Sequence, residues 1–304
     1  MSDTTLTYAL VSAVRDEENN LARLAACIGE QTVKPLEWVI VDTGSTDATP
    51  ELAIELAQSL GFARVMSIDG VERSDKRGVI AAEVGLRIAM DARGFVAGIE
   101  ALEHTPDVVI KVDADLSFEA DFFERMLEAF AGDPALGLTS GVCTELEDGE
   151  WRAQHGTRSH VWGASRAYRW ACFQDVSPLE DREGWDEIDA VKAKLHGWRI
   201  GALLDVPFRH HRAWGRRAGS ARTRWEAQGD TAHYMGYRFS YLVARAVWRA
   251  RKDPAALAMI SGYARAVATR QAQCPDLDVL GHLRAEQRAR RLPLRLRESL
   301  GLAA

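Results

Sequence analysis

The sequence has no apolar run of the roughly 18 residues that a membrane-spanning helix needs. No basic segment precedes the first apolar stretch, residues 7–14, so we do not expect a secretory signal peptide. Cysteine is scarce, and its spacing excludes the common cysteine metal motifs. We therefore expect reduced thiols and a cytoplasmic protein. The four cysteines are Cys27, Cys143, Cys172 and Cys274.

The chain has the composition of a globular protein: of its 304 residues, 47% are hydrophobic and 27% are charged. This length predicts one large domain with an extension, which we place at 1–215 and 216–304. From Arg212 onward there are 18 Lys and Arg against 7 Asp and Glu, a net charge of +11, whereas residues 1–211 carry −17. Such asymmetry indicates an anionic partner for the basic part, or its pairing with the acidic part of the same chain.

Apolar periodicity predicts alternating strands and helices over the first 131 residues. Strands are expected at 7–14, 36–43, 63–69 and 107–115, and helices at 17–31, 47–61, 78–93 and 119–131. Repeated units of this kind form a mainly parallel sheet with helices on both faces, and ligands bind at the carboxyl ends of its strands. The sequence therefore predicts an α/β fold followed by a basic, mainly helical extension.

Polar segments follow several of these strands and should meet at one edge of the sheet. They read "VRDEEN" (14–19), "VDTGSTD" (41–47) and "VDAD" (112–115), while "SDKRG" (74–78) precedes a helix. In their order and spacing these segments, together with "GASRAYRW" and "GWDEIDAVKAKLHGWRI", resemble family 2 glycosyltransferases over roughly residues 6–215. That resemblance implies the GT-A fold, a mixed, mainly parallel sheet that binds nucleotide sugars, and transfer with inversion.

Asp113 and Asp115 end a buried strand and can present oxygens to one hard cation, Mg²⁺ or Mn²⁺. The structural alternative is that they cap the turn before the next helix. By resemblance, Asp113 lies near the nucleotide ribose, and Asp115 coordinates the cation that bridges the diphosphate. A histidine after a later strand completes such a site in the family; the count favours His210, with His211 as the alternative.

The resemblance also assigns the nucleotide side of the site. Glu17 and Asp42 would contact the nucleotide. The family usually has a second acidic residue at the position of Thr43, so the base is not assumed to be uracil. The diphosphate would meet the basic segment before the third helix, where glycine allows close backbone approach at a helix N-terminus. This segment contains Lys76, Arg77 and Gly78.

Asp186 falls where the family places its catalytic carboxylate, with Trp185 instead of the usual preceding Glu. An inverting transfer needs one base beside the acceptor hydroxyl. Glu187 and Asp189 are alternatives for that base if the register differs. Acidic residues in a first helical turn also complement the helix dipole, which is the structural explanation of the same cluster.

The acceptor side is assigned to aromatic and basic residues near this helix. An indole ring offers a flat surface to a sugar, and a guanidinium binds phosphate. Packing in the core is the alternative for aromatic residues in a chain with nine tryptophans. The residues expected on the acceptor side are Trp162, Arg166 and Trp185.

The sequence thus predicts a metal-dependent glycosyltransferase that moves a hexosyl or related sugar from a nucleoside diphosphate to a hydroxyl of a surface glycan or lipid-linked saccharide. A basic stretch with aromatic residues, 231–254, suggests contact with an anionic membrane at its inner face, or a packed helical cap. No nucleic-acid-binding module is recognised. Two alternatives remain: an inactive nucleotide- or glycan-binding module, and a sugar-phosphate nucleotidyltransferase. A nucleotidyltransferase would need a Gly-rich nucleotide loop after the first strand, and the segment found there, "VRDEEN", contains no glycine.

Overall fold

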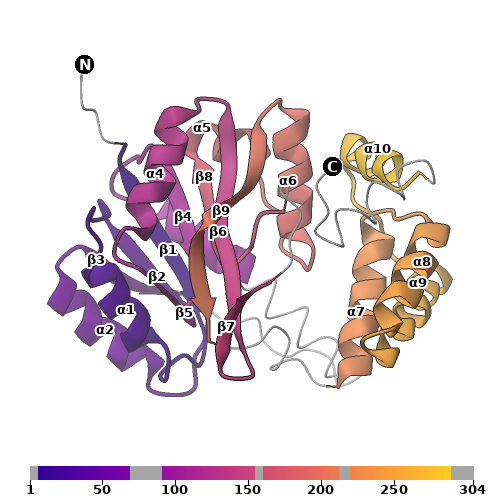
Figure 1. Cartoon of the computed structure of the whole chain (residues 1–304), viewed down its shortest axis with the longest axis horizontal. Coiled ribbons are helices and arrows are strands. Elements are labelled where there is room, and N and C mark those ends of the chain that lie inside the picture. Colours follow the sequence, from indigo (N-terminus) through magenta and orange to yellow (C-terminus); the bar gives the residue numbers. More distant parts are fainter. Residues whose placement is uncertain (1–5, 69–90, 155–159, 212–219, 289–304) are drawn as a thin grey trace.

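The computed structural model describes residues 6–68, 91–154, 160–211 and 220–288. These residues form a twisted sheet with helices on both faces, and a separate group of helices beside it (Figure 1). The strands of the sheet are β1 (Tyr8–Val14), β2 (Trp38–Asp42), β3 (Ala63–Ser67), β4 (Val108–Val112), β5 (Leu116–Phe118), β6 (Leu136–Glu147), β7 (Glu150–Ala153), β8 (Ser165–Arg169) and β9 (Arg199–His210).

The sheet is mixed, as the sequence predicts. Its order is β3-β2-β1-β4-β8-β6-β9-β5, with β7 paired to β6. The first four strands of this order are parallel. Parallel neighbours need a crossover connection, which is usually a helix that carries the chain back to the start of the next strand. In the other half β6 and β9 are parallel, while the pairs β4–β8, β6–β8, β5–β9 and β6–β7 are antiparallel. The carboxyl ends of β1, β2 and β4 therefore meet at one edge.

Alternation along the central strands divides the core into two layers. In β1, Leu10 packs on one side with α1 and α4, and Val11 packs on the other with α5, α6 and the helical residues 91–100. Side chains of a strand point alternately to opposite faces, so each helical layer receives every second residue. The covering helices are α1 (Leu21–Gly29), α2 (Thr49–Leu60), α4 (Phe122–Gly132), α5 (Trp170–Val176) and α6 (Trp185–Leu195).

Helical residues 91–100 approach the sheet closely because glycine replaces a side chain at the contact. A Cβ atom on Gly94 would lie 2.7 Å from the Cβ of Ala13 and 3.0 Å from the Cγ2 of Thr43. The same helical residues carry Asp91, whose carboxylate lies 3.2 Å from the Nζ atom of Lys111 on β4. Most of the predicted helix 78–93 lies outside the described residues.

The C-terminal residues form their own helical cluster, which shares apolar contacts with α6 (Figure 1). Ile188 and Val191 of α6 pack among its buried side chains. The predicted boundary at 215/216 falls outside the described residues, so the two-domain division stays a prediction. No helix in the described part of the chain is long and apolar enough to cross a membrane. The cluster contains α7 (Ala221–Tyr234), α8 (Phe239–Ala250), the 3₁₀ turn η1 (Pro254–Leu257), α9 (Ala258–Ala268) and α10 (Leu277–Glu286).

Candidate active site

A buried lysine holds two carboxylates together at the end of β4. The Nζ atom of Lys111 lies 3.2 Å from the Asp91 carboxylate and pairs with Asp113, and the lysine side chain is only 2% exposed. An ionised lysine is buried only with partners that offset its lost hydration. Lys111 and Asp113 therefore share one face of the strand end, and Asp91 reaches them from the helical residues 91–100.

Several carboxylates crowd around this lysine. Burial raises the pKa of Asp113 to about 7; Lys111 opposes the shift, and the charges of Asp91 and Asp115 add to it. Burial likewise raises the pKa of Asp91, with Lys111 opposing and Asp186 and Asp115 adding. The two predicted functional acids, Asp115 and Asp186, thus act electrostatically on the same residue. This concentration of carboxylates suits the sheet edge to a further cation.

His210 lies beside Asp115. Its Nε2 atom is 3.4 Å from the Asp115 Oδ1 atom, and both side chains are mostly buried. Burial disfavours protonation of His210, but its hydrogen bonds to Asp115 and Cys143 and the charges of Asp115 and Asp113 outweigh it and raise the pKa to about 10. His211 faces the other way, with its Nε2 atom 2.7 Å from the Ser117 hydroxyl and its ring against Trp151. Of the two candidate histidines, the structure brings His210 to Asp115.

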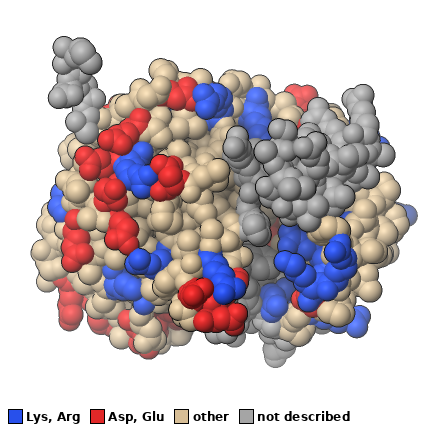
Figure 2. All heavy atoms as spheres, viewed as in Figure 1, with Lys and Arg blue, Asp and Glu red and all other residues tan. Residues whose placement is uncertain are grey.

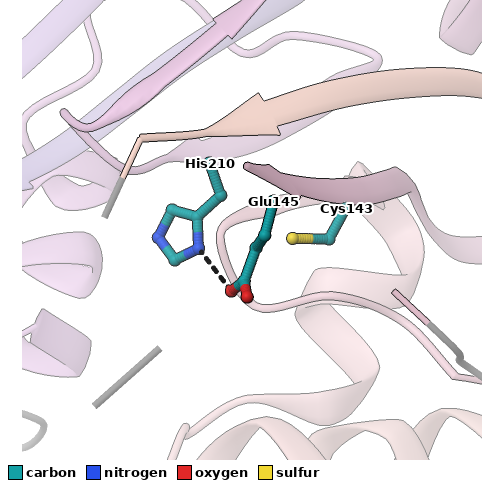
Figure 3. Close-up of side chains that lie close together, drawn as sticks. All are labelled: Cys143, Glu145 and His210. Atoms are coloured by element: carbon teal, nitrogen blue, oxygen red, sulfur yellow. Dashed lines mark ion pairs between the residues drawn. The ribbon is translucent and has the colours of Figure 1, made fainter. Parts of the chain in front are cut away.

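Two further side chains surround His210 and were not predicted from the sequence. Glu145 and Cys143, both on β6, lie with His210 in one group whose potential ligand atoms are within 4.8 Å of one another (Figure 3). The Glu145 Oε1 atom is 3.6 Å from the His210 Nδ1 atom. The spacing of Cys143 and Glu145, two residues apart on one strand, is the only sequence signal for this pair. That His210 lies beside these two residues follows only from the pairing of β6 with β9.

Asp42 and Thr43 serve the turn after β2. The Asp42 carboxylate accepts hydrogen bonds from the Ser45 hydroxyl, at 2.5 Å, and the Ser45 backbone N–H, at 3.2 Å. Thr43 is buried, and its hydroxyl donates to the Val14 carbonyl at the end of β1. Both residues lie at the expected edge of the sheet, but these contacts fix the loop. Their assignment to the nucleotide stays a prediction.

Glu17 lies in the loop between β1 and α1 and is buried. Its backbone N–H donates to the Thr49 hydroxyl at 2.7 Å, and its carboxylate accepts from the Asn20 side chain at 2.7 Å. The residue therefore joins the loop that follows β1 to the start of α2. The predicted diphosphate contacts Lys76, Arg77 and Gly78 lie outside the described residues.

Asp186 is the second residue of α6 and follows Gly184, the N-cap, whose φ is 91°. A Cβ atom on Gly163 would lie 3.3 Å from the Asp186 Oδ2 atom, so the carboxylate borders the segment before β8. That segment also carries the Gly163 carbonyl, 3.4 Å from Lys111 Nζ. The Asp186 carboxylate therefore lies beside the same loop, at Gly163, that also contacts Lys111.

The two alternatives to Asp186 are held by protein groups. Glu187 accepts a hydrogen bond from the Tyr237 hydroxyl at 2.7 Å, so it faces the C-terminal helices. Asp189 is 1% exposed and pairs with the buried Arg166 and with Tyr168. Neither carboxylate is positioned as Asp186 is, beside the loop that borders Lys111.

The acceptor-side assignments of Arg166 and Trp185 are wrong in this structure. Arg166 is 0% exposed, and its guanidinium binds Asp189, Tyr168 and the carbonyls of Val161 and Asp186. Trp185 is 3% exposed and packs in the core layer. Side-chain direction, which residue type does not determine, sends both inward. Trp162 is half-buried beside His160, with ring centroids 4.6 Å apart, and its acceptor role stays a prediction.

The comparisons with known proteins bear on the family of the N-terminal part and on the fold. The model described as "Glycosyl transferase family 2" matches residues 10–82. No curated protein matches the chain significantly. The resemblance to family 2 glycosyltransferases is thereby confirmed for the N-terminal part, which contains β1, α1, β2, α2 and β3.

Solved structures extend the likeness to the rest of the fold. A mannosyltransferase, PcManGT from Pyrobaculum calidifontis in complex with GDP-Man and Mn²⁺, is 16% identical with a TM-score of 0.56, covering 98% of this chain and 85% of that one. S. aureus TarS 1–349 is 16% identical with a TM-score of 0.51, covering 75% and 65%. GalNAc-T7 with UDP, GalNAc and Mn²⁺ is 14% identical with a TM-score of 0.56, covering 81% and 51%.

These likenesses establish the fold. The chain spans slightly less than two thirds of the TarS structure and about half of the GalNAc-T7 structure. The described residues have the GT-A fold, as the sequence predicts, with the acidic cluster at the carboxyl ends of the parallel strands.

Proposed function

We propose that this protein is a metal-dependent glycosyltransferase that moves a hexosyl or related sugar from a nucleoside diphosphate to a hydroxyl acceptor with inversion. The observation that carries the proposal is the 3.4 Å contact between His210 Nε2 and Asp115 Oδ1, at the sheet edge that also bears Asp113. The family match to residues 10–82 supports a glycosyltransferase. The proposed catalytic domain is 1–215, with 216–304 as its helical extension.

The donor set fits a divalent cation. Two ligands of one cation, each at about 2.1 Å from it, lie about 3.0–3.4 Å apart, and the Asp115–His210 contact falls in this range. Asp115 and His210 would hold Mg²⁺ or Mn²⁺, with Asp113 nearer the ribose. The cation would stabilise the negative charge that develops on the leaving diphosphate. PcManGT and GalNAc-T7 were solved with Mn²⁺, which supports a divalent metal here.

Asp186 is proposed as the catalytic base. The acceptor oxygen forms a bond to the anomeric carbon while the bond from that carbon to the diphosphate oxygen breaks. The hydroxyl proton passes to the Asp186 carboxylate, and the bonding electrons leave with the diphosphate. Attack from the face opposite the leaving group inverts the anomeric configuration. Asp186 suits this role because its carboxylate borders the loop that also contacts Lys111.

The nucleotide is proposed to lie over the loops that follow β1 and β2, against Glu17, Asp42 and Thr43. Its diphosphate would extend toward the segment 76–78. TarS was solved with UDP and with UDP-GlcNAc, and PcManGT with GDP-Man, so the fold accommodates two bases. Both uridine and guanosine donors therefore belong in the first screen.

The acceptor is proposed to be a surface glycan or a lipid-linked saccharide, with Trp162 on the acceptor side and the enzyme at the inner face of a membrane. Lys and Arg gather over the C-terminal helices at the lower right of Figure 2, while Asp and Glu are concentrated on the left. Phe239 and Val247 of α8 are 51% and 55% exposed. Exposed apolar side chains among cations suit an anionic membrane surface.

Ligand-induced stabilisation tests the donor proposal. The full-length protein would be melted with UDP, GDP and their sugar conjugates, each with and without Mn²⁺. Binding to the native state raises stability as ln(1 + [L]/Kd), so a true donor raises Tm in a metal-dependent way. Asp115→Ala should abolish the metal dependence. Asp121→Ala, an exposed acid at the start of α4, should not.

Turnover then separates an enzyme from a binding module. Release of nucleoside diphosphate from the stabilising donor, alone or with acceptor, supports transfer. Stabilisation by a donor without any release of diphosphate across glycan and lipid-linked acceptors would identify a binding module instead. If none of the nucleotides stabilises the protein with or without Mn²⁺, the proposed function is wrong.

A further inference from the structure

His210 has a carboxylate on each side of its ring. Its Nε2 atom is 3.4 Å from Asp115, and its Nδ1 atom is 3.6 Å from Glu145. In Figure 3 the Glu145 carboxylate approaches the ring nitrogen that faces β6. The two contacts come from different elements, because Asp115 lies just before β5 whereas Glu145 lies on β6. The ring is therefore bracketed along the axis that joins its two nitrogens.

Strand register places Glu145 opposite His210. In the parallel pairing of β6 with β9, Glu145 is the register partner of His210. Cys143 lies two residues earlier on β6, points to the same face and is 2% exposed, so it closes the buried side of the group. The Glu145 and His210 side chains are 19% and 15% exposed. A mostly buried glutamate beside a histidine is an arrangement that packing alone does not explain.

The two carboxylates bear on which nitrogen of the His210 ring carries the hydrogen. A neutral imidazole carries a hydrogen on one nitrogen and a lone pair on the other. Asp115 and Glu145 are both acceptors when ionised, so the cation decides between the two nitrogens. A cation held by Asp115 and Nε2 takes the lone pair of Nε2, and the hydrogen of the neutral ring then lies on Nδ1, where Glu145 can accept it. Carboxylates that bind the far nitrogen of a metal-ligating histidine fix the ring and its tautomer in this way.

We propose that Glu145 is a positioning residue that holds His210 through Nδ1 and aims Nε2 at the cation site on Asp115. The contact of 3.6 Å is longer than a hydrogen bond, so the two side chains must close by several tenths of an ångström when the site is loaded. Glu145 acts through His210 and does not itself bind the cation. This inference rests on the proposed role of His210 as a ligand.

Direct measurement of Mn²⁺ binding tests the proposal without catalysis. Free Mn²⁺ would be titrated by electron paramagnetic resonance against the full-length protein and its variants. Glu145→Gln keeps the shape of the side chain but lets it donate, and it should weaken Mn²⁺ binding about 10–100-fold, as loss of such an outer partner typically does. Glu147→Gln, an exposed change two residues along β6, is the matched control and should leave the affinity unchanged.

A double-mutant cycle shows whether Glu145 acts through His210. In a His210→Ala background, Glu145→Gln should have no further effect on Mn²⁺ affinity. An equal loss in both backgrounds would make Glu145 an independent ligand and overturn the proposal. No loss from Glu145→Gln, with a clear loss from His210→Ala, would also overturn it while leaving the proposed function intact. If neither His210→Ala nor Asp115→Ala weakens binding, the proposed metal site itself fails, and this inference fails with it.

Two spectroscopic measurements separate loss of the Glu145–His210 contact from a general structural effect of the Glu145 substitution. Nitrogen-15 NMR of the Mg²⁺-loaded protein should show His210 with its hydrogen on Nδ1, and this signature should change in Glu145→Gln. A different tautomer in the native protein contradicts the proposal. A thiolate-to-metal charge-transfer band with Co²⁺ that disappears in Cys143→Ser, but persists in Cys172→Ser, would instead make Cys143 a ligand on the Glu145 side of the ring and overturn it.

Discussion

At the scale of single residues, the three acids at the start of α6 have different surroundings. Glu187 is bound by Tyr237 and Asp189 by Arg166, whereas Asp186 borders the Gly163 loop next to Lys111. We therefore expect Asp186→Asn to lower sugar transfer by about 10²–10⁴-fold, the usual contribution of a general base. Donor affinity should persist, so the loss should appear in kcat, measured from initial rates of transfer at saturating donor.

Glu187→Gln is the control for this prediction, because it changes the adjacent carboxylate by the same single atom. It should retain most of the transfer rate. Near-native transfer by Asp186→Asn together with an inactive Glu187→Gln would assign the base to Glu187. Near-native transfer in both would exclude both residues as the base, and near-native transfer by Asp189→Asn as well would remove the catalytic role of this helix.

Arg166 and Asp189 form a buried pair, and its loss should cost stability. Removal of one partner of a buried ion pair leaves an uncompensated charge and costs about 3–5 kcal/mol. Arg166→Met should therefore lower the free energy of unfolding in urea by about that amount. Arg125→Met removes a pair with Asp205, whose side chain is 80% exposed, and should cost less than about 1 kcal/mol. Similar losses from both variants would contradict the structural role assigned to Arg166.

The sequence reveals residue types at this scale but not where their side chains point. Asp113 and Asp115 could be predicted because two acids end a buried strand. Lys111 is the one charged residue inside that strand, so a buried partner for it could be expected. The sequence does not show that this partner is Asp91, because Asp91 lies on helical residues packed against the sheet. Arg166 looked like a phosphate ligand because exposed arginine often is, and only its position on a central strand shows that it is buried.

At the scale of elements, the start of α6 depends on its contact with α7. Gly184 has a φ of 91°, and a Cβ atom there would lie 2.8 Å from Thr231 Cγ2 and 3.0 Å from Met235 Sδ. Gly184→Ala should therefore incur both backbone strain and a clash. We expect a loss of more than about 1–2 kcal/mol in urea unfolding, the usual cost of the left-handed conformation alone.

Gly61→Ala provides a control that separates the two costs. Gly61 ends α2 with a φ of 73°, and nothing lies within 4 Å of the added Cβ atom. This variant should show only the backbone cost. If Gly184→Ala is no more destabilising than Gly61→Ala, the close packing of α7 on the start of α6 does not contribute to stability.

Strands and helices of the first half could be predicted because each has its own apolar period and turn residues. The predicted strand 36–43 is β2, Trp38–Asp42, and the predicted helix 47–61 is α2, which ends at Gly61 as expected. The stretch 231–254 has one basic and aromatic composition but contains the end of α7 and all of α8. Pairing between distant strands had no local signal, so the Glu145–His210 contact could not be predicted.

At the scale of the whole molecule, charge is divided between the two ends of the chain. Residues 1–211 carry −17 and the remainder +11, and Figure 2 shows the basic groups gathered over the C-terminal helices. Internal pairing uses some of them, for example Arg265 with Glu226. Just after α8, Arg251 lies over the half-buried Trp248 ring, 4.1 Å from its centroid, and Phe239 and Val247 of the same helix are exposed. Attraction to an anionic lipid surface would combine both features.

Co-sedimentation with liposomes tests this attraction. The full-length protein should sediment with vesicles that contain anionic lipid, remain in solution with neutral vesicles, and be released as salt is raised, because salt screens exposed charges over about 10 Å at 0.1 M. Phe239→Ser with Val247→Ser should weaken binding at every salt concentration, since they remove apolar contact without changing charge. Ile54→Ser on α2, which is 49% exposed on the acidic part, is the matched control. Equal sedimentation with neutral and anionic vesicles, or none with either, would mean that the basic helices serve as a packed cap that balances the charge of the rest of the chain.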